Sequence, residues 1–482
     1  MSTSGGADDG DLRAFARSFA TLAQRAHDLA FGDEGAPFAE LIDQHLEVPE
    51  HGPATVGQDL PAVERPNLQL AVEELSGSLR PLGLPDEVAY HPGFSIAALA
   101  TGSFRGPSAP VAAVFDDVAT GVDNRLRCVR AGVWLAEYDG QPIVIGVFPR
   151  ERHRPGGPEV RLEVLAASET LSTAVLEALA DLRRRHNVYR GQVLAFTFSE
   201  FGDFGIEFMV RPTTIADEVI LAPDDLASIR RHTVDLAEHA DALRNAGQHL
   251  RRGLLLYGPP GTGKTHTVGH LMAAMPERTV VVLQGASVGA LGHAAAIVKA
   301  LPPAMLVIED VDLVAAERSM HLMGGSPLLF QLLNEMDGLA AGDDVIFILT
   351  TNRLDLLEPA LAARPGRIDH AVHIALPDAA ARRRLFELYL GRVEHEVDSL
   401  TAAVELSADM PGAFIKEAVR RGVSNMLVDG DVTMTGDHLE RAVTEMLNAL
   451  DPVRAAVAGG PPGMMPPMTH GLAPMPPPSF EG

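Results

Sequence analysis

The chain has 482 residues, of which 46% are hydrophobic and 21% charged, which is enough apolar sequence for two to four globular domains. Its formal net charge of −25 argues against non-specific binding of DNA or RNA, because that affinity comes mainly from the neutralisation of phosphates. The single cysteine, Cys128, excludes an internal disulfide and fits a reducing compartment.

The N-terminal sequence and the hydropathy predict a cytoplasmic protein without a membrane segment. Asp8, Asp9 and Asp11 stand where a signal peptide carries basic residues followed by an apolar stretch. No apolar run approaches the roughly 18 residues that a membrane-spanning helix requires.

Residues 1–95 are expected to form an acidic region of helices and loops. Amphipathic stretches occur at Leu12–Phe31 and Leu68–Leu79, and the first hundred residues contain 16 Asp and Glu against 5 Arg. This charge would suit a basic partner, although solubility is the simpler explanation.

Residues 96–220 are expected to form an α+β domain, whose role the residues do not reveal. One helix is predicted after Ser168, a typical N-cap residue, because Leu171, Val175 and Leu179 follow at helical spacing. The expected strands are Arg127–Ala136, Pro142–Phe148, Val160–Leu165, Gln192–Phe198 and Gly205–Val210.

A helical linker is predicted over residues 221–250, and an α/β domain over 251–376. In the α/β domain, strand-like runs alternate with helical segments, a pattern that predicts a parallel sheet covered on both faces. Residues 377–450 are predicted to form a helical bundle, and residues 451–482, rich in Pro, Met and Gly, a disordered tail. The strand-like runs of the α/β domain are Gly253–Tyr257, Thr279–Leu283, Met305–Ile308, Val345–Leu349 and Ala371–Ile374.

The strongest motif is Gly-Pro-Pro-Gly-Thr-Gly-Lys-Thr at residues 258–265, between an apolar run and a helical segment. It matches the P-loop, in which glycines let backbone N–H groups point at phosphate oxygens and the helix N-terminus adds positive charge. Lys264 is expected to reach the β- and γ-phosphates of ATP, and Thr265 to ligate Mg²⁺. The chain has 3 Lys against 36 Arg, which suggests that an ammonium is needed here. The expected nucleotide-binding residues are Gly258, Pro259, Pro260, Gly261, Thr262, Gly263, Lys264, Thr265 and His266.

A second motif consists of the apolar run Met305–Ile308 followed by Glu309 and Asp310. It is typical of a Walker B strand, where one carboxylate holds Mg²⁺ or its water and the other polarises the attacking water. Solvated charges at a strand end would explain such a pair elsewhere, but its position after a P-loop favours the catalytic interpretation.

Three further segments make the chain similar to the AAA family of ATPases, from about Arg251 to about Leu450. They include the second region of homology, which separates true AAA members from other P-loop proteins. The segments are Leu-Leu-Asn-Glu-Met-Asp-Gly-Leu at 332–339, Ile-Leu-Thr-Thr-Asn-Arg at 348–353 and Pro-Ala-Leu-Ala-Ala-Arg-Pro-Gly-Arg-Ile-Asp at 359–369. The resemblance implies a P-loop NTPase sheet with a helical lid, preceded by the α+β N-terminal region.

The resemblance also implies roles for residues outside the P-loop. Asn352 would be sensor 1, in contact with the γ-phosphate or the attacking water. Arg364 and Arg367 would be arginine fingers inserted into the neighbouring subunit's site, a task that suits the fixed charge and fork geometry of a guanidinium. Gly412 and Ala413 stand where the family has a Gly-Ala pair that opens a lid helix near the adenine and the phosphates.

Two departures from the family bear on activity. The usual Walker B order is Asp-Glu, whereas this chain has Glu309-Asp310, so Glu309 takes the magnesium role and the shorter Asp310 the water-activating role. Many substrate-threading members also have an aromatic residue in the loop after the second strand, where this chain has Ala290. Slow hydrolysis and a weak grip on a threaded polypeptide are therefore expected.

The favoured hypothesis is a cytoplasmic AAA ATPase that assembles into a hexameric ring, because arginine fingers act in trans. It would hydrolyse ATP with Mg²⁺ to remodel a protein client that residues 1–220 select. The first alternative is an ATP-gated scaffold that barely hydrolyses ATP, which the two departures favour. A small-molecule kinase and a DNA-directed motor are weaker alternatives, since the fingers and lid argue against the first and the net charge against the second.

Overall fold

The chain divides into two compact units in the computed structural model. The first contains Met1–Thr213, Ile229–Leu256 and Val268–Ala371, and the second Thr214–Ser228, Tyr257–Thr267 and Val372–Gly482. The structure describes residues 37–46, 52–77, 79–91, 93–103, 109–150, 159–198, 204–312, 327–338, 340, 342–354, 368–396 and 400–458. The expected amphipathic stretch Leu12–Phe31 lies outside these residues. Among the described helices, none combines the length and apolarity needed to cross a bilayer.

An antiparallel five-stranded sheet in the order β1-β7-β6-β5-β2 organises the N-terminal part of the first unit. Its apolar side chains alternate between the two faces, as the period of a strand requires. Ile143 and Ile145 enter the core on one face, while Val144 enters the core on the other. The strands are β1 (Ala54–Pro61), β2 (Leu82–Gly83), β5 (Gly132–Tyr138), β6 (Gln141–Arg150) and β7 (Glu159–Ala166).

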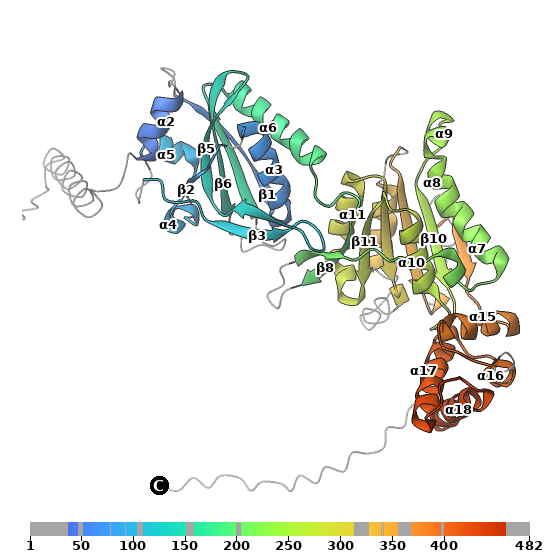
Figure 1. Cartoon of the computed structure of the whole chain (residues 1–482). Coiled ribbons are helices and arrows are strands. Elements are labelled where there is room, and N and C mark those ends of the chain that lie inside the picture. The colour runs from blue at the N-terminus through green and yellow to red at the C-terminus, as the bar shows by residue number, and fades with distance from the viewer. Residues whose placement is uncertain are drawn as a thin grey trace, which may run out of the picture. The chain divides into compact units, whose positions relative to one another are not determined.

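Helices cover both faces of this sheet (Figure 1). On one face lie α3 (Arg65–Ser76) and α6 (Glu169–Arg185), and on the other α2 (Phe38–Leu46), with the short α4 (Asp86–Ala89) and α5 (Ile96–Ala100). The α6 helix begins where expected, because the Ser168 hydroxyl accepts a hydrogen bond from the Leu171 amide at 3.2 Å.

Two expectations for this part of the chain need correction. The regions 1–95 and 96–220 are not separate, since β1 from the first pairs along its whole length with β7 from the second. The expected strand Arg127–Ala136 is divided into β4 (Arg125–Val129) and β5. Arg130 lies at the break, where its guanidinium donates to Asp116 at 2.7 Å and, with that of Arg65, holds the pKa of this carboxyl at about 2. The β4 strand pairs instead with β3 (Phe115–Ala119).

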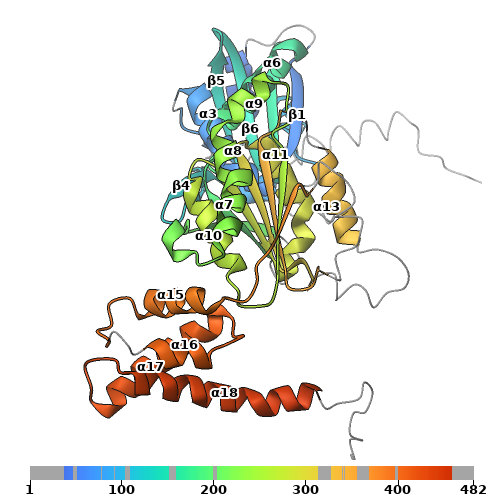
Figure 2. The same ribbon diagram turned by 90° about the vertical axis from the view of Figure 1, so that its right-hand side faces the viewer.

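The second sheet has seven strands in the order β14-β10-β13-β12-β11-β8-β9. The pairs β11–β12 and β12–β13 are parallel, as the alternating pattern predicts, and every residue of β12 and β13 is buried. Helix α10 lies on one face, with α11 and α13 on the other (Figure 2). These elements are β10 (Arg252–Tyr257), α10 (Lys264–Ala274), β11 (Thr279–Gln284), α11 (Leu291–Ala300), β12 (Ala304–Glu309), α13 (Pro327–Asp337), β13 (Val345–Thr351) and β14 (His370–His373).

The strands β8 (Val193–Phe198) and β9 (Phe204–Met209) were expected in the N-terminal α+β domain, but they extend this second sheet. Val193 pairs with Val280 in a parallel ladder between β8 and β11, and β9 returns antiparallel to β8. The alternating sequence identifies these strands but cannot say which sheet they join, since that depends on a contact some 87 residues away in the chain.

The remaining elements are helical. The predicted linker contains α7 (Pro223–Arg230), a π-helical turn at Arg231–Asp235, α8 (Leu236–Glu238) and α9 (Ala240–Asn245). A C-terminal bundle of α15 (Ala379–Leu390), α16 (Leu400–Leu406), α17 (Gly412–Asp429) and α18 (Gly436–Ala458) surrounds its own apolar core (Figure 2). Helix α18 runs eight residues into the segment predicted as a disordered tail, because the run Arg454–Ala458 is rich in good helix formers.

A buried ion network joins the amino ends of three strands in the second sheet. The Asp344 carboxylate, just before β13, accepts hydrogen bonds from Arg252 at 2.8 Å and from Arg278 at 2.7 Å. Arg278 is only 1% exposed, and burial lowers the pKa of Arg252. Both guanidiniums therefore share the Asp344 carboxylate, and Arg278 has in addition a longer ionic contact, 3.9 Å, with the largely exposed Glu277.

Replacing Asp344 with Ala should be strongly destabilising, because it removes the buried carboxylate that accepts hydrogen bonds from two buried cations. We expect a loss of about 3–5 kcal/mol, which corresponds to a fall of about 10 °C in the thermal midpoint followed by circular dichroism. The control is Asp241→Ala, where the carboxylate is 92% exposed and pairs with Arg244 at the surface. Equal midpoints for the two variants would contradict the role given to Asp344.

Candidate functional site

The loop 258–263 between β10 and α10 has a backbone that only glycine adopts readily. Gly258, Gly261 and Gly263 have φ of 148°, 75° and 105°, all in the region that disfavours side chains. A Cβ on Gly258 would lie 2.2 Å from the Ile374 carbonyl oxygen. At this close approach the Ile374 amide donates to the Tyr257 carbonyl at 2.7 Å. The glycines thus allow a concave loop of the kind that binds anions.

Lys264 is the first residue of α10, and its side chain folds back over this loop. The ammonium Nζ donates to the carbonyls of Gly258 and Pro259, each at 2.8 Å, and the residue is only 6% exposed. Thr265 and His266, which follow on the first turn of α10, are exposed. A buried ammonium held by neutral carbonyls can exchange them for phosphate oxygens, which form stronger charge-assisted bonds.

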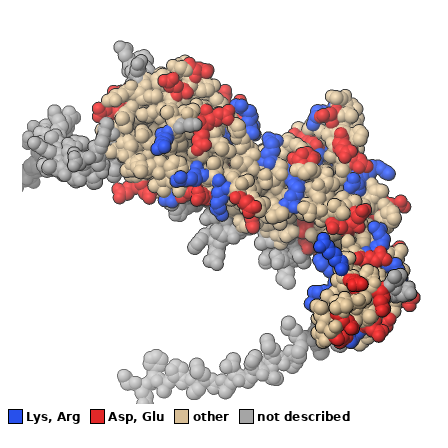
Figure 3. All heavy atoms as spheres, in the orientation of Figure 1, with Lys and Arg blue, Asp and Glu red and all other residues tan. Residues whose placement is uncertain are grey.

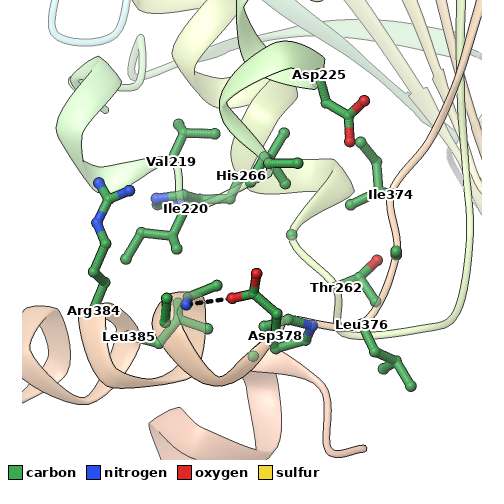
Figure 4. Close-up of a pocket in the computed structure, with 18 of the residues that line it drawn as sticks. Val219, Ile220, Asp225, Thr262, His266, Ile374, Leu376, Asp378, Arg384 and Leu385 are labelled. Atoms are coloured by element: carbon green, nitrogen blue, oxygen red, sulfur yellow. Dashed lines mark hydrogen bonds between the residues drawn. The ribbon is translucent and has the colours of Figure 1, made fainter.

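A cavity of about 530 Å³ adjoins the loop within the second unit (Figure 4). Its size falls in the range of small-molecule sites, and its walls are mainly apolar. His266 and Thr262 face it together with apolar side chains that include Ile220 and Leu385 (Figure 4). Tyr389 also lines it, and burial raises the pKa of that phenol, so the hydroxyl stays protonated. The cavity can hold a planar ring beside the anion-binding loop.

The N-terminus of α17 lies against the same loop. The Ala413 amide donates to the Gly261 carbonyl at 3.0 Å, and a Cβ on Gly261 would lie 2.9 Å from the Ala413 side chain. Gly412 lines the cavity. The structure therefore brings Gly412 and Ala413 of the expected lid into contact with the loop 258–263.

The expected catalytic carboxylates lie in the first unit, at the carboxyl ends of its parallel strands. Glu309, the last residue of β12, is 8% exposed and accepts a hydrogen bond from the side-chain amide of Gln284 at the end of β11. Asp310 follows with φ of 50°, and its amide donates to the Thr350 hydroxyl at 3.0 Å. Asn352, just after β13, donates from its side-chain amide to Asp310 Oδ1 at 3.0 Å. The structure thus joins Asp310 and Asn352 directly.

Sequence reasoning missed three residues of this edge. Asp312 is buried, and its Oδ1 accepts hydrogen bonds from the Thr351 hydroxyl at 2.9 Å and the Asn352 amide at 3.1 Å, which orients Asn352. Gln284 and Thr350 hold Glu309 and Asp310. Gln284 is the last residue of β11, Thr350 the next-to-last of β13, and Asp312 follows β12 closely, and this position at strand ends is the signal in the sequence that could have marked them.

Two other expectations concern loops. The expected arginine fingers Arg364 and Arg367 lie outside the described residues. Ala290 is described, at the end of a 3₁₀ turn (Gly285–Ala290), and it is 3% exposed. The methyl group of Ala290 is therefore buried and unavailable to grip a polypeptide.

Thr265 and Glu309 provide hard oxygen donors of the type that Mg²⁺ prefers. Among the residues with described positions, no group of three or more His, Cys, Asp or Glu is arranged to hold a metal ion. Mg²⁺ in nucleotide sites takes several of its ligands from phosphates and water, so it needs few donors from the protein.

Comparison with known proteins places this geometry in context. Residues 254–376 match the model of the family described as "ATPase family associated with various cellular activities (AAA)". A stretch of 237 residues is 33% identical to the ATP-dependent zinc metalloprotease YME1L of Drosophila melanogaster, covering 46% of this chain and 32% of that protein.

Archaeal proteins named proteasome-activating nucleotidase are also similar. The one from Saccharolobus islandicus is 30% identical over 256 residues, which is 50% of this chain and 64% of that protein. The one from Methanocaldococcus jannaschii is 30% identical over 232 residues, 45% of this chain and 54% of that protein. The chain therefore spans between about a third and two thirds of the length of these relatives.

Replacing Gly258 with Ala should weaken nucleotide binding, because the added methyl group would collide with the Ile374 carbonyl and displace the loop. We expect a dissociation constant at least about tenfold higher, equivalent to about 1.4 kcal/mol, in a titration with a fluorescent ADP analogue. The matched control is Gly289→Ala, since a Cβ there would have no neighbour within 4 Å. Unchanged affinity in Gly258→Ala would show that the loop is not the anion-binding element.

Proposed function

This chain belongs to the AAA family of P-loop ATPases, and we propose that it binds and hydrolyses ATP with Mg²⁺ to drive conformational change in a protein partner. The proposal is supported by two preformed groups of residues, one in each unit. One is the glycine loop with its buried Lys264, and the other is the edge where Asn352 holds Asp310.

The phosphates would bind in the glycine loop, where Lys264 would leave the carbonyls of Gly258 and Pro259 and pair with the β- and γ-phosphate oxygens. The base would occupy the apolar cavity beside His266. Thr265 and Glu309 would hold Mg²⁺, which when bound neutralises negative charge on the phosphates. With ATP bound in this way, the γ-phosphate would be the group that the water molecule attacks.

Asp310 would orient the attacking water and accept its proton. Because Asn352 donates to Oδ1 of Asp310, that carboxylate has a fixed direction and a second oxygen for the water. Asp312 fixes Asn352 in turn through its backbone amide. This arrangement supports hydrolysis despite the shorter side chain of Asp310, since position and direction matter more than reach once the carboxylate is held.

Arg364 and Arg367 would complete the site of a neighbouring copy, so activity would require a homo-oligomer, and a hexameric ring is the expected form. The N-terminal five-stranded body would select the protein client. Positive and negative side chains are interspersed over the face drawn in Figure 3, in keeping with a protein client rather than a nucleic acid. We place the protein in the cytoplasm.

A second candidate function is an ATP-gated scaffold that turns over little ATP. Burial of Ala290 favours it, because that loop presents no aromatic side chain with which to pull on a client. The two functions share the nucleotide site and differ in whether Asp310 supports turnover.

Lys264→Ala should remove ATP binding, because it deletes the ammonium that lies over the glycine loop. We expect the dissociation constant to rise at least about 100-fold, or about 2.7 kcal/mol, in a titration with a fluorescent ATP analogue. Lys299→Ala is the matched control, since this lysine pairs with Glu335 at 2.7 Å in the α11–α13 region. Retained affinity in Lys264→Ala would exclude the glycine loop as the phosphate site.

The trans role of the fingers can be tested by mixing two inactive variants. The first is the double variant with Arg364→Ala and Arg367→Ala, which keeps Asp310 but lacks both arginine fingers. The second, Asp310→Asn, keeps the fingers but lacks the carboxylate that acts as the base. Random mixed rings should regain about a quarter of wild-type turnover, because half the copies have Asp310 and half of their neighbours supply fingers. A mixture that stays as inactive as its components would rule out fingers acting between copies.

A further inference from the structure

Arg211 lies just after β9 and binds the end of the P-loop helix. Its Nη1 donates to the Met272 carbonyl at 2.8 Å and to the Met275 carbonyl at 3.5 Å. Its Nη2 donates to the carbonyls of Arg278 at 2.8 Å and Gly191 at 3.0 Å. One guanidinium thus joins four backbone carbonyls from two parts of the chain that are distant in sequence.

Two of these contacts lie at the C-terminal end of α10, one within its last turn and one just after it. The last four carbonyls of a helix lack partners within the helix, and a cation near them also interacts favourably with the helix dipole. Met272 belongs to the last turn of α10, and Met275 follows its final residue, Ala274. Arg211 therefore fixes this helix end along its axis.

Residues 188–191, which include the Gly191 partner of Arg211, are held in turn by the N-terminal part of the chain that carries the five-stranded sheet. Gly191 lies just before β8, and its carbonyl accepts from Arg211. Its amide donates a hydrogen bond to Oγ1 of Thr279, the first residue of β11, at 3.0 Å. Two and three residues earlier in the chain, Tyr189 and Val188 bind to residues in or just before α3. The Val188 amide donates to Asn67 Oδ1 at 2.9 Å, and the Tyr189 hydroxyl donates to the Val63 carbonyl at 2.5 Å.

Tyr189 also secures the β8–β9 hairpin itself. Its ring stacks on Phe208 of β9, with centroids 5.7 Å apart and planes inclined by 18°. The hairpin, the strand β11 and the N-terminal body therefore meet around residues 188–191, and Arg211 connects this junction to α10.

We propose that Arg211 is a positioning residue of the nucleotide site, which sets the axial position of α10 and so of Lys264 and Thr265 at its other end. The helix has 11 residues and is about 16 Å long, short enough to move as a rigid rod. A shift at the C-terminal end is then transmitted to the first turn. This inference rests on the proposed function, because it assigns Arg211 to the site where ATP would bind.

The geometry calls for arginine rather than lysine. The planar fork of a guanidinium reaches carbonyls on both sides at once, whereas an ammonium is a compact point charge. Lysine at position 211 should therefore retain part of the effect, and methionine, with a similar apolar stem but no donor, should retain none.

The test uses the full chain with Arg211→Met, Arg211→Lys and a matched control, Arg190→Met. Arg190 is exposed and donates to the Pro302 carbonyl at 3.1 Å in the same region, and among the described residues it makes no hydrogen bond to α10. Intact sites are counted by titration with a fluorescent ADP analogue, and ATP turnover is expressed per titrated site. This normalisation removes any loss that comes only from a smaller folded fraction.

We expect Arg211→Met to lower turnover per site about tenfold, less than the roughly 100-fold loss that a full 1 Å displacement can cause. Arg211→Lys should recover part of this loss, and Arg190→Met should stay within about twofold of wild type. Unchanged turnover per site in Arg211→Met, even with a lower thermal midpoint, would overturn the proposal and leave Arg211 a purely structural residue.

Failure of the proposed function gives a different result. If the wild type binds nucleotide but does not hydrolyse ATP, the ATPase proposal fails. The positioning role is then tested by the affinity for nucleotide alone. In that case Arg211→Met should raise the dissociation constant for the ADP analogue at least about threefold against Arg190→Met, through displacement of Lys264. Equal dissociation constants in the two variants would overturn the positioning role.

Discussion

The close approach of Gly258 to the Ile374 carbonyl is the constraint on which the rest of the site depends. It requires a residue without a Cβ, and it lets the chain turn directly from β10 into the concave loop 258–263. That turn places Lys264 at the start of α10, with its ammonium over the loop, and brings Gly261 against Ala413 of the helical bundle. Without this close approach, the positions of the loop, of Lys264 and of the contact between Gly261 and Ala413 would all change.

Much of the second sheet could be predicted because its strands are buried on both faces. Strands β12 and β13 are continuous apolar runs that end in polar residues, so both their extent and their functional ends are visible in the sequence. The sheet membership of the strands in the N-terminal half was harder to predict from the sequence. Alternation identifies β8 and β9 as strands, but their partner β11 lies far along the chain, and the division at Arg130 depends on its tertiary pairing with Asp116.

The candidate site shows the same division between local and long-range information. The glycine loop and the Glu309-Asp310 pair are contiguous motifs, so their chemistry can be inferred from residue types alone. Asp312 acts through the backbone amide of Asn352, 40 positions away, and Arg211 through the Met272 carbonyl, 61 positions away, and no local pattern marks such contacts. Gln284 likewise meets Glu309 only because parallel strands bring their carboxyl ends together.

The measurement that tests the account most directly is steady-state ATP hydrolysis across a range of protein concentrations, with wild type and Asp310→Asn compared side by side. The account predicts that specific activity rises with concentration, because each site needs a neighbouring copy, and that it collapses in the variant. Wild-type protein that binds ATP but never exceeds the variant in turnover would contradict it, and would favour the ATP-gated scaffold instead.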